Sequence, residues 1–407
     1  MSNKKYLNIF QMNNKKYFVY LGSSGFPYGL AEIKKMTLIS KSLVLKDHSV
    51  TIINKKGVHS SKNYPDLKVS GNSEGINYVY TSGDPFFNKN FSKRNLLKIK
   101  GILNEFQLLY KLRKDKQLDY AILSTHSFTS IFYYAVLSKL FGFKTILNHV
   151  EYYSGVKMNR SNVGKWINDK LYDQYAPLLV DISFPISEFL IDHLKKITPN
   201  KKYFKIPVLA EFEKYNGVET LEEPKYFFFS GAAAYTEIIM FIIDSFNRLK
   251  NSSAYLYLGV KGSEADLTQI RKYISNNFQK EKIKLFTTLT EKQLYNYYQN
   301  ATALLIPLRP TIQDKARFPH KIGEYLASGN PVISTNYGEV KYYFIDGETM
   351  LIADSYNIES FSNKMQFVID NPVEAQKIGK NGQTLASSDF DYKNYGAKII
   401  DFLNGEI

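Results

Sequence analysis

The charged residues best placed to do chemistry gather in one stretch, ARFPHKIGEYLASGNPVISTNYGEV, which runs from Ala316 to Val340. Arg317 and Lys321 stand shortly before Glu324, a carboxylate at the head of an apolar, helix-like pattern. A helix N-terminus offers free N–H groups and a positive dipole end to anions, and the two cations would add full charges there. The alternative is a helix-dipole or surface carboxylate with an ordinary exposed loop arginine.

A glycine-rich loop, GSSGFPYG, occupies residues 22–29 between a strand pattern and a helix pattern. Such loops let a phosphate or an acceptor approach the backbone closely. The loop is not a G-x-G-x-x-G motif, and Asn54 stands where a dinucleotide site carries an acidic residue. Both departures argue against an NAD site, and a plain strand-to-helix turn is the alternative to a functional loop.

Two histidines end strand patterns, His126 in LSTHS and His149 in LNHVEYY. A core or surface role is the simpler interpretation of both, and we keep it for His126. The pair Asp389 and Asp391 forms a D-x-D, but it precedes a helical pattern and is better explained by capping. The chain has no cysteine and no His/Asp/Glu cluster with metal-ligand spacing, so we predict no metal and no thiol chemistry.

The first half of the chain alternates strand and helix patterns. The strands are predicted at 17–21, 49–53, 76–80, 120–123, 144–147 and 181–184, and the helices at 30–46, 92–110, 130–140, 163–175 and from 187. Ser92 is the predicted cap of the second helix, whose apolar positions step by three and four residues. These positions are Leu96, Ile99, Leu103, Phe106 and Tyr110, and we expect them to pack on the sheet.

A second series of the same kind begins after a linker at Ile206–Asn216. Its strands are predicted at 226–229, 254–258, 283–286, 303–306 and 332–334, and its helices at 238–249, 265–278, 291–299 and 322–327. The alternation predicts the α/β class, with two Rossmann-like domains facing across a cleft. The domains are predicted at 1–206 and 207–389, with a C-terminal helix at about 390–407 that packs back on the first domain.

The charge divides unevenly between the halves. Residues 1–206 hold 32 Lys and Arg against 14 Asp and Glu, a net charge of +18, whereas residues 207–407 hold 21 against 24, a net charge of −3. A basic half favours phosphate-bearing partners such as lipid, nucleic acid or nucleotide. The N-terminal residues show no signal peptide, and no apolar stretch is long enough to span a bilayer, so we expect a cytoplasmic protein.

The stretch from Glu324 to Ile333 resembles the donor-binding motif of GT-B glycosyltransferases, in particular the retaining family 4. The match lies in a Glu, a helix of small residues, then Gly329 and Pro331 before a strand. Residues 338–340 and 346–348 look like the stretch that follows in that family, and a weaker resemblance extends over nearly the whole chain. The resemblance implies a GT-B fold and metal-independent chemistry without a cofactor, with a nucleotide-diphospho-sugar as co-substrate.

The resemblance also implies roles for single residues. Glu324 would accept hydrogen bonds from both ribose hydroxyls. His149 would hydrogen-bond to the transferred sugar or the leaving phosphate, and Glu151 would orient the acceptor. Further contacts with the donor are predicted for Arg317, Lys321, Gly231 and Ile322. Lys321 would also stabilise the transition state. Contacts with the diphosphate or the acceptor are predicted for Gly25 and Gly29.

The sequence also departs from the family pattern. Ala316 stands where the family has a first Glu that contacts the donor sugar, and Ala232–Glu237 lacks the Arg and Lys that bind the diphosphate. The cationic work would then fall to Lys321, Arg317 or Arg309. A catalytically inactive GT-B protein that serves as the binding subunit of a glycosyltransferase complex is therefore the alternative to an enzyme.

The leading hypothesis is transfer of a sugar, with retention, to a hydroxyl of a glycan or lipid-linked glycan in polysaccharide biosynthesis. Nucleic-acid binding by the basic half is disfavoured because no recognition module or arginine-rich tract is present. We instead expect the first domain to contact an anionic membrane at the inner face of the cell membrane. The expected contact is the basic helix Lys93–Lys116, acting by charge more than by insertion.

Overall fold

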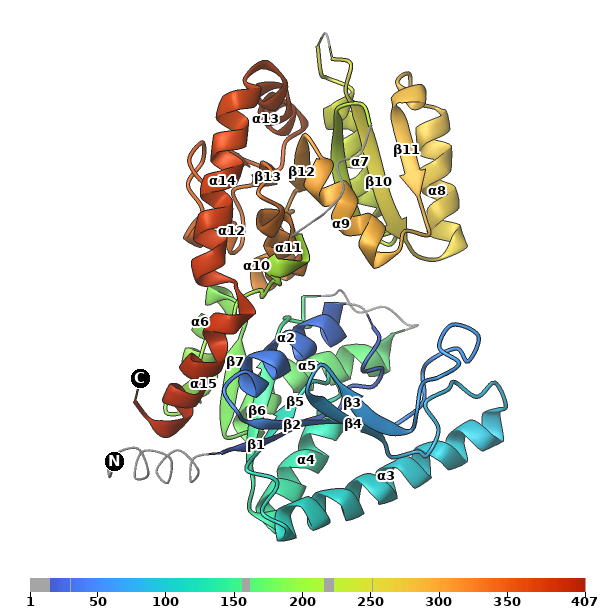
Figure 1. Ribbon diagram of the computed structural model, residues 1–407, viewed down its shortest axis with the longest axis vertical. Coiled ribbons are helices and arrows are strands. Elements are labelled where there is room, and N and C mark those ends of the chain that lie inside the picture. The colour runs from blue at the N-terminus through green and yellow to red at the C-terminus, as the bar shows by residue number, and fades with distance from the viewer. Residues whose placement is uncertain (1–14, 30, 156–161, 216–222, 251, 407) are drawn as a thin grey trace, which may run out of the picture. The chain divides into compact units, whose positions relative to one another are not determined.

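The chain forms two compact units in a computed structural model (Figure 1). The structure describes residues 15–29, 31–155, 162–215, 223–250 and 252–406. Unit 1 contains residues up to Pro207 together with Tyr392 onward, and unit 2 runs from Val208 to Asp391. The N-terminal residues on which the signal-peptide prediction rests, Leu30 and Asn216 lie outside the described residues.

Unit 1 is built on a sheet in the order β3-β4-β2-β1-β5-β6-β7-β8. Neighbouring strands are parallel except for β3, which pairs antiparallel with β4 and was not predicted. The strands are β1 (Tyr17–Leu21), β2 (Ser49–Asn54), β3 (Ser70–Ser73), β4 (Ile76–Tyr80), β5 (Tyr120–Leu123), β6 (Lys144–His149), β7 (Ile182–Pro185) and β8 (Lys202–Tyr203). Their central residues are buried because helices cover a parallel sheet on both faces.

Some of the helices of unit 1 begin at side-chain caps. They are α2 (Ala31–Val44), α3 (Phe91–Lys114), α4 (Phe128–Phe141), α5 (Val163–Leu179), α6 (Glu188–Ile197), η3 (Tyr392–Asn394) and α15 (Tyr395–Asn404). Ser127 and Ser187 cap α4 and α6. The predicted cap at Ser92 is wrong: Asn90 accepts the Lys93 N–H at 3.0 Å, so α3 starts at Phe91.

The C-terminal helix α15 packs on α2 within unit 1. Gly396 makes the close contact, because a Cβ there would lie 2.0 Å from the carbonyl oxygen of Ser42. The chain therefore returns to unit 1 after completing unit 2.

Unit 2 contains a fully parallel sheet in the order β11-β10-β9-β12-β13-β14. Its strands are β9 (Tyr226–Ala232), β10 (Tyr255–Lys261), β11 (Ile283–Phe286), β12 (Ala303–Ile306), β13 (Val332–Thr335) and β14 (Leu351–Ala353). Its helices are η1 (Phe212–Tyr215), α7 (Thr236–Phe246), α8 (Glu264–Ser275), η2 (Lys280–Lys282), α9 (Glu291–Asn300), α10 (Ile312–Ala316), α11 (His320–Ser328), α12 (Val340–Tyr343), α13 (Ile358–Asp370) and α14 (Pro372–Asp389).

The predicted fold class, two Rossmann-like α/β units, is confirmed. In both sheets the first strand lies beside the fourth parallel strand, the order of a doubly wound fold. Two short edge strands, β8 and β14, were missed because two or three residues carry no readable period. Across the described part of the chain, no helix is long and apolar enough to cross a membrane.

The prediction for α3 is wrong in one respect: its apolar seam does not pack on the sheet. Leu96, Ile99 and Leu103 are 58–66% exposed. The residues that α3 buries are Gly101, Glu105 and Leu109, on the opposite face of the helix.

Candidate active site

The strand order of unit 2 predicts where its sheet binds a ligand, at the carboxyl ends of two central strands. The order of strands reverses between β9 and β12, which pair directly. Open parallel sheets bind ligands beyond the carboxyl ends of the two strands at such a switch point. The segments that follow β9 and β12 are residues 233–235 and 307–311, and they lead into α7 and α10.

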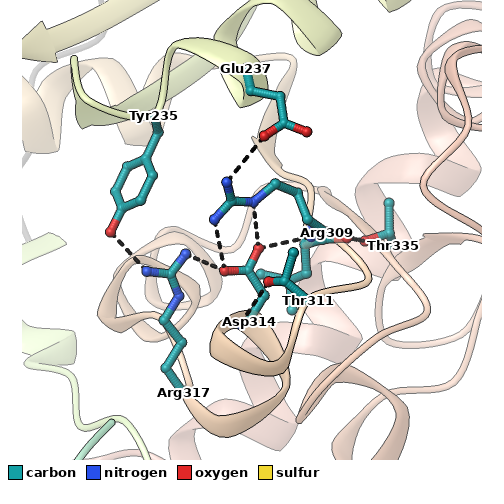
Figure 2. Close-up of polar contacts among 8 residues, drawn as sticks. Tyr235, Glu237, Arg309, Thr311, Asp314, Arg317 and Thr335 are labelled. Atoms are coloured by element: carbon teal, nitrogen blue, oxygen red, sulfur yellow. Dashed lines mark hydrogen bonds and ion pairs between the residues drawn. The ribbon is translucent and has the colours of Figure 1, made fainter. Parts of the chain in front are cut away.

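A buried carboxylate, Asp314, organises this edge (Figure 2). Its Oδ2 accepts the backbone N–H of Arg309 at 2.9 Å and Arg309 Nε at 3.1 Å, and its Oδ1 accepts Arg309 Nη2 at 3.2 Å. Oδ1 also accepts a hydrogen bond from Arg317 Nη2. Thr311 fixes the start of α10 by accepting the Asp314 N–H. One buried negative charge thus holds two guanidinium groups, which leaves a surplus of positive charge.

Both arginines also reach the loop after β9. Arg317 Nη1 donates to the Tyr235 hydroxyl at 2.7 Å, and the guanidinium groups of Arg317 and Arg309 lie 5.0 and 5.9 Å from the centre of the Tyr235 ring. The hydrogen bond with Asp314 raises the pKa of Arg309. Arg309 Nη1 meets Glu237 at 3.3 Å, but that carboxylate is 70% exposed and the ion pair is worth little in water. The segment Ala232–Glu237, which has no Arg or Lys, is therefore in contact with Arg309 and Arg317 from other segments.

Lys321 and Glu324 form a second pair beside β9. Lys321 Nζ lies 2.9 Å from Glu324 Oε2 and donates to the Tyr298 hydroxyl at 2.8 Å. Tyr298 in turn contacts Ser230 Oγ at 2.7 Å, which ties α11 to the end of β9. Desolvation acts to lower the pKa of Lys321, but Glu324 and the tyrosine hydroxyls outweigh it and hold that pKa well above its usual value.

The start of α11 differs from the prediction. The helix begins at His320 after Pro319, so Glu324 lies in its second turn and not at its head. Pro319 accepts the N–H of Ile322 at 3.0 Å, and the Ile322 side chain is fully buried. The dipole argument therefore applies to residues 320–323 and not to the Glu324 carboxylate.

Gly231 and Ala316 are explained by close packing. A Cβ on Gly231 would come within 2.8 Å of the Phe229 ring, so a larger residue would displace that ring. Ala316, the last residue of α10, has no exposed surface. A glutamate in its place would have to bury its carboxylate or move α10.

The switch point of unit 1 lies between β1 and β5, and the glycine-rich loop follows β1 there. Gly22 has φ +92°, and a Cβ on it would lie 2.8 Å from Thr125, so glycine is required. The side-chain oxygen of Asn54 accepts the N–H groups of Gly25 at 2.8 Å and Phe26 at 3.1 Å. These two donors are already used and are not free for a phosphate.

Gly29 serves packing in the same loop. A Cβ on Gly29 would lie 2.3 Å from Ile33 in α2, which only glycine avoids. The structure thus gives local reasons for Gly25 and Gly29, and their predicted contacts with a diphosphate or acceptor stay predictions.

The two strand-end histidines differ in exposure. His149 at the end of β6 is completely buried, its ring packs near Tyr172 and His193, and neither ring nitrogen has a hydrogen-bond partner among the described residues. Burial lowers its pKa to about 3, with His193 and Lys35 adding to the effect, so the ring is neutral. His126, kept as an ordinary residue above, is exposed after β5 beside Tyr153.

Two further predictions concern acidic residues. Glu151 follows β6 and is partly exposed. Burial raises the pKa of Tyr153, and the negative charges of Glu151, Glu32 and Asp173 raise it further. Asp389 is the last residue of α14, so it does not cap the helix after it. No group of three or more His, Asp or Glu side chains within the described ranges could hold a metal ion.

Sequence reasoning missed the residues that assemble the arginine cluster. Asp314 and Tyr235 stand in short segments without a period, and nothing in the local pattern indicates that one is buried. The only signal was an acidic residue between two arginines, Arg309 and Arg317, in a loop after a strand.

The segment that contains this cluster matches a known protein family. Residues 195–385 match the family described as Glycosyl transferases group 1. No curated protein matches the chain by sequence.

Solved structures with a similar fold extend the likeness over both units. Sucrose-phosphate synthase from Thermosynechococcus elongatus has a TM-score of 0.72 at 12% identity, with 96% of this chain and 99% of that chain covered. A glycosyltransferase from Rickettsia africae has a TM-score of 0.69 at 15% identity, with 96% and 100% covered. HepE of Anabaena, solved with UDP and glucose, has a TM-score of 0.68 at 13% identity, with 96% and 99% covered. At these identities the likeness shows the GT-B fold.

Proposed function

We propose that this chain is a glycosyltransferase that moves a sugar from a nucleotide-diphospho-sugar to a hydroxyl group, with retention. The match of residues 195–385 to the group 1 glycosyltransferases supports the transferase class. The observation that carries the proposal is the cluster of Arg309, Asp314 and Arg317 at the switch point of unit 2. Paired guanidinium groups held at this edge suit a diphosphate, whose oxygens accept two parallel hydrogen bonds from each guanidinium. Retention rests on the family resemblance.

The reaction breaks the bond between the anomeric carbon and the diphosphate oxygen. The acceptor hydroxyl forms the new bond to that carbon and gives up its proton, while the bonding electrons leave with the diphosphate. Negative charge therefore grows on the diphosphate in the transition state. Arg309 and Arg317, fixed in advance by Asp314, stabilise that charge without reorganising. They supply the positive charge to the diphosphate that other family members supply from the Arg and Lys missing in Ala232–Glu237.

The other site residues keep supporting roles in this proposal. Glu324 receives the ribose hydroxyls, and Lys321 holds its carboxylate in place at 2.9 Å. Gly231 and Ile322 give the donor a close approach to the backbone. On unit 1, Glu151 and the loop with Gly25 and Gly29 serve the acceptor.

His149 has the least support among the proposed site residues. Its ring is buried, so contact with the sugar would require Tyr172 or its neighbours to move.

The acceptor is proposed to be a glycan or a lipid-linked glycan, which places the enzyme in polysaccharide synthesis at the cytoplasmic face of the cell membrane. UDP is the first nucleotide to test, because HepE, with a similar fold, was solved with UDP. We expect no cofactor and no metal requirement.

Thermal unfolding with UDP, GDP, ADP and their sugars tests donor binding. A ligand that binds only the folded state raises the free energy of unfolding by about 2.7 kcal/mol at a concentration of 100 Kd. The proposal expects one nucleotide to raise Tm in the parent and not in an Arg309→Ala, Arg317→Ala double variant. The control is Arg271→Ala, because Arg271 is a half-exposed arginine of α8 outside the cluster. Equal shifts in the double variant and the parent would remove the cluster from the donor site.

The alternative is an inactive binding subunit, and Ala316 motivates it. Donor hydrolysis with product analysis separates the two. An active enzyme releases nucleoside diphosphate slowly even without acceptor, whereas a binding subunit shows the thermal shift and releases none.

A further inference from the structure

Helix α3 of unit 1 presents apolar side chains to solvent. Each of its exposed apolar residues is between 42% and 68% exposed, and from Leu96 to Tyr110 they fall on one stripe at a spacing of three or four residues. They are Phe91, Leu96, Ile99, Ile102, Leu103, Phe106 and Tyr110. A soluble helix normally buries such a stripe, whereas about half of the surface of these side chains is open to solvent.

The opposite, inward face of α3 buries Gly101, Glu105 and Leu109. Gly101 packs so closely that a Cβ would lie 2.2 Å from the carbonyl oxygen of Lys55. Glu105 is fully buried, accepts the Tyr134 hydroxyl at 3.0 Å and lies 3.4 Å from Lys55 Nζ. These contacts fix the rotation of α3, so its apolar stripe is held outward by packing on the other side.

Helix α4 continues the stripe. Phe132, Val136 and Leu140 are spaced by four residues and are 42–67% exposed. Phe141 at the end of α4 joins the two helices, because its ring centre lies 5.3 Å from that of Phe106 and 5.8 Å from that of Tyr110. We call the exposed apolar residues of α3 and α4 together the α3–α4 face.

Positive charge surrounds this face. Helix α3 carries seven basic residues, and its single acidic residue, Glu105, is buried and paired. The basic residues are Lys93, Arg94, Lys98, Lys100, Lys111, Arg113 and Lys114.

A pocket of about 390 Å³ lies where α3 and α4 end. Four cations line it, together with Asp119, Tyr120 and Gly142; the cations are Lys15, Lys16, Arg113 and Lys144. Such a pocket has the charge and size for a phosphate group.

We propose that the α3–α4 face docks unit 1 on an anionic membrane surface. The apolar stripe enters the boundary between headgroups and acyl chains, its basic flanks meet lipid phosphates, and the pocket holds one such phosphate. This proposal goes beyond glycosyl transfer and does not depend on it. A second copy of the chain fits less well, because a two-fold contact through this face would bring the basic flanks of both copies together.

Sedimentation with vesicles tests the proposal on the full-length protein. The two vesicles are phosphatidylcholine alone and phosphatidylcholine with part replaced by phosphatidylglycerol, at about 0.1 M salt, where exposed charges are screened over ~10 Å. The expected result is binding to the anionic vesicles only, weakening as salt is added. Equal binding to both, or to neither, would overturn the proposal.

Two variants divide the apolar and charged contributions. Leu96→Ser, Ile99→Ser, Leu103→Ser removes the centre of the stripe and should weaken anionic binding more than tenfold with unchanged Tm, because these side chains are exposed. Lys98→Gln, Lys111→Gln, Lys114→Gln should weaken it roughly hundredfold, since each basic residue contributes about fivefold. The matched control, Phe278→Ser with Val373→Ser, removes apolar residues of unit 2 that are 77% and 84% exposed and should bind like the parent.

Two further readouts can contradict the proposal, and a third separates it from the proposed activity. Parent-like binding by the serine variant would exclude insertion. If the parent is a dimer in solution and the serine variant is a monomer, the α3–α4 face pairs with a second copy of the chain. Donor hydrolysis in water should be the same in parent and variants, so loss of docking is distinguishable from failure of the proposed activity.

Discussion

The two switch points of this protein hold their loops in opposite ways. In unit 2 a single buried carboxylate, Asp314, holds two arginines, and the second carboxylate in contact with Arg309, Glu237, is 70% exposed. In unit 1 the Asn54 amide accepts the N–H groups of Gly25 and Phe26 and so uses the donors that a phosphate would need. The same topology thus gathers cationic side chains at one switch point and uses backbone donors internally at the other, a contrast that suits the proposed donor and acceptor assignments.

The largest effect should follow removal of the carboxylate that organises unit 2. Asp314→Ala removes the buried counter-charge of two partly buried guanidinium groups and leaves Arg309 paired with the exposed Glu237. Breaking a buried ion pair by removing one partner costs about 3–5 kcal/mol. Urea unfolding should show a loss of that size, whereas Asp266→Ala, which removes an exposed aspartate of α8, should change little. A loss under ~1 kcal/mol would mean that the cluster does not depend on Asp314.

Arg317→Ala tests the anion site with less damage to the fold. Arg317 is anchored by Asp314 and Tyr235, and its loss removes one of two charges proposed to meet the diphosphate. Removing one preorganised donor to a developing charge costs about 10²-fold in kcat. Steady-state kinetics with the preferred donor should show kcat falling more than KM rises. An unchanged kcat/KM would show that Arg317 does not contact the diphosphate, and the proposed difference between the two switch points would be wrong.

The buried histidine of unit 1 predicts a dependence of stability on pH. His149 has a pKa of about 3 in the folded protein, while its ordinary value is about 6.5. Below pH 6.5 the unfolded chain binds a proton that the folded chain does not, so stability falls by about 1.4 kcal/mol per pH unit from this group.

The measurement is urea unfolding of the parent and of His149→Phe from pH 7 to pH 5. Between pH 7 and pH 5 the free energy of unfolding of the parent should fall by about 2 kcal/mol more than that of His149→Phe, since only the parent carries the titrating ring. Curves that stay parallel would show that His149 is not buried as a neutral base.

The smallest effect is expected at the loop of unit 1. Asn54→Ala leaves two buried N–H groups without their acceptor, at a cost of about 1–3 kcal/mol in unfolding free energy. Because the proposed donor site lies in unit 2, KM for the donor should not change. Asn54→Asp keeps an acceptor and should recover part of the loss. A large rise in donor KM in Asn54→Ala would indicate that the nucleotide binds at the loop of unit 1, and the proposed division of donor and acceptor between the two units would be wrong.

The class of the fold and most of its strands could be predicted from the order of the residues alone. Buried strands such as β1 and β9 are continuous apolar runs, and the strand–helix alternation admits few topologies. The motif from Glu324 to Pro331 was also readable, because a helix, a glycine with φ +77° and a proline mark a turn locally.

Which side chains meet and which helix faces remain exposed depends on contacts between distant parts of the chain. The period of α3 showed an apolar stripe but not its direction, which Gly101 and Glu105 set by packing against Lys55. The arginine cluster likewise joins Tyr235 to Arg309 and Arg317, from segments that follow different strands. Periodicity records what one element offers, whereas a contact between distant residues depends on sheet order and loop geometry, and no local pattern contains these.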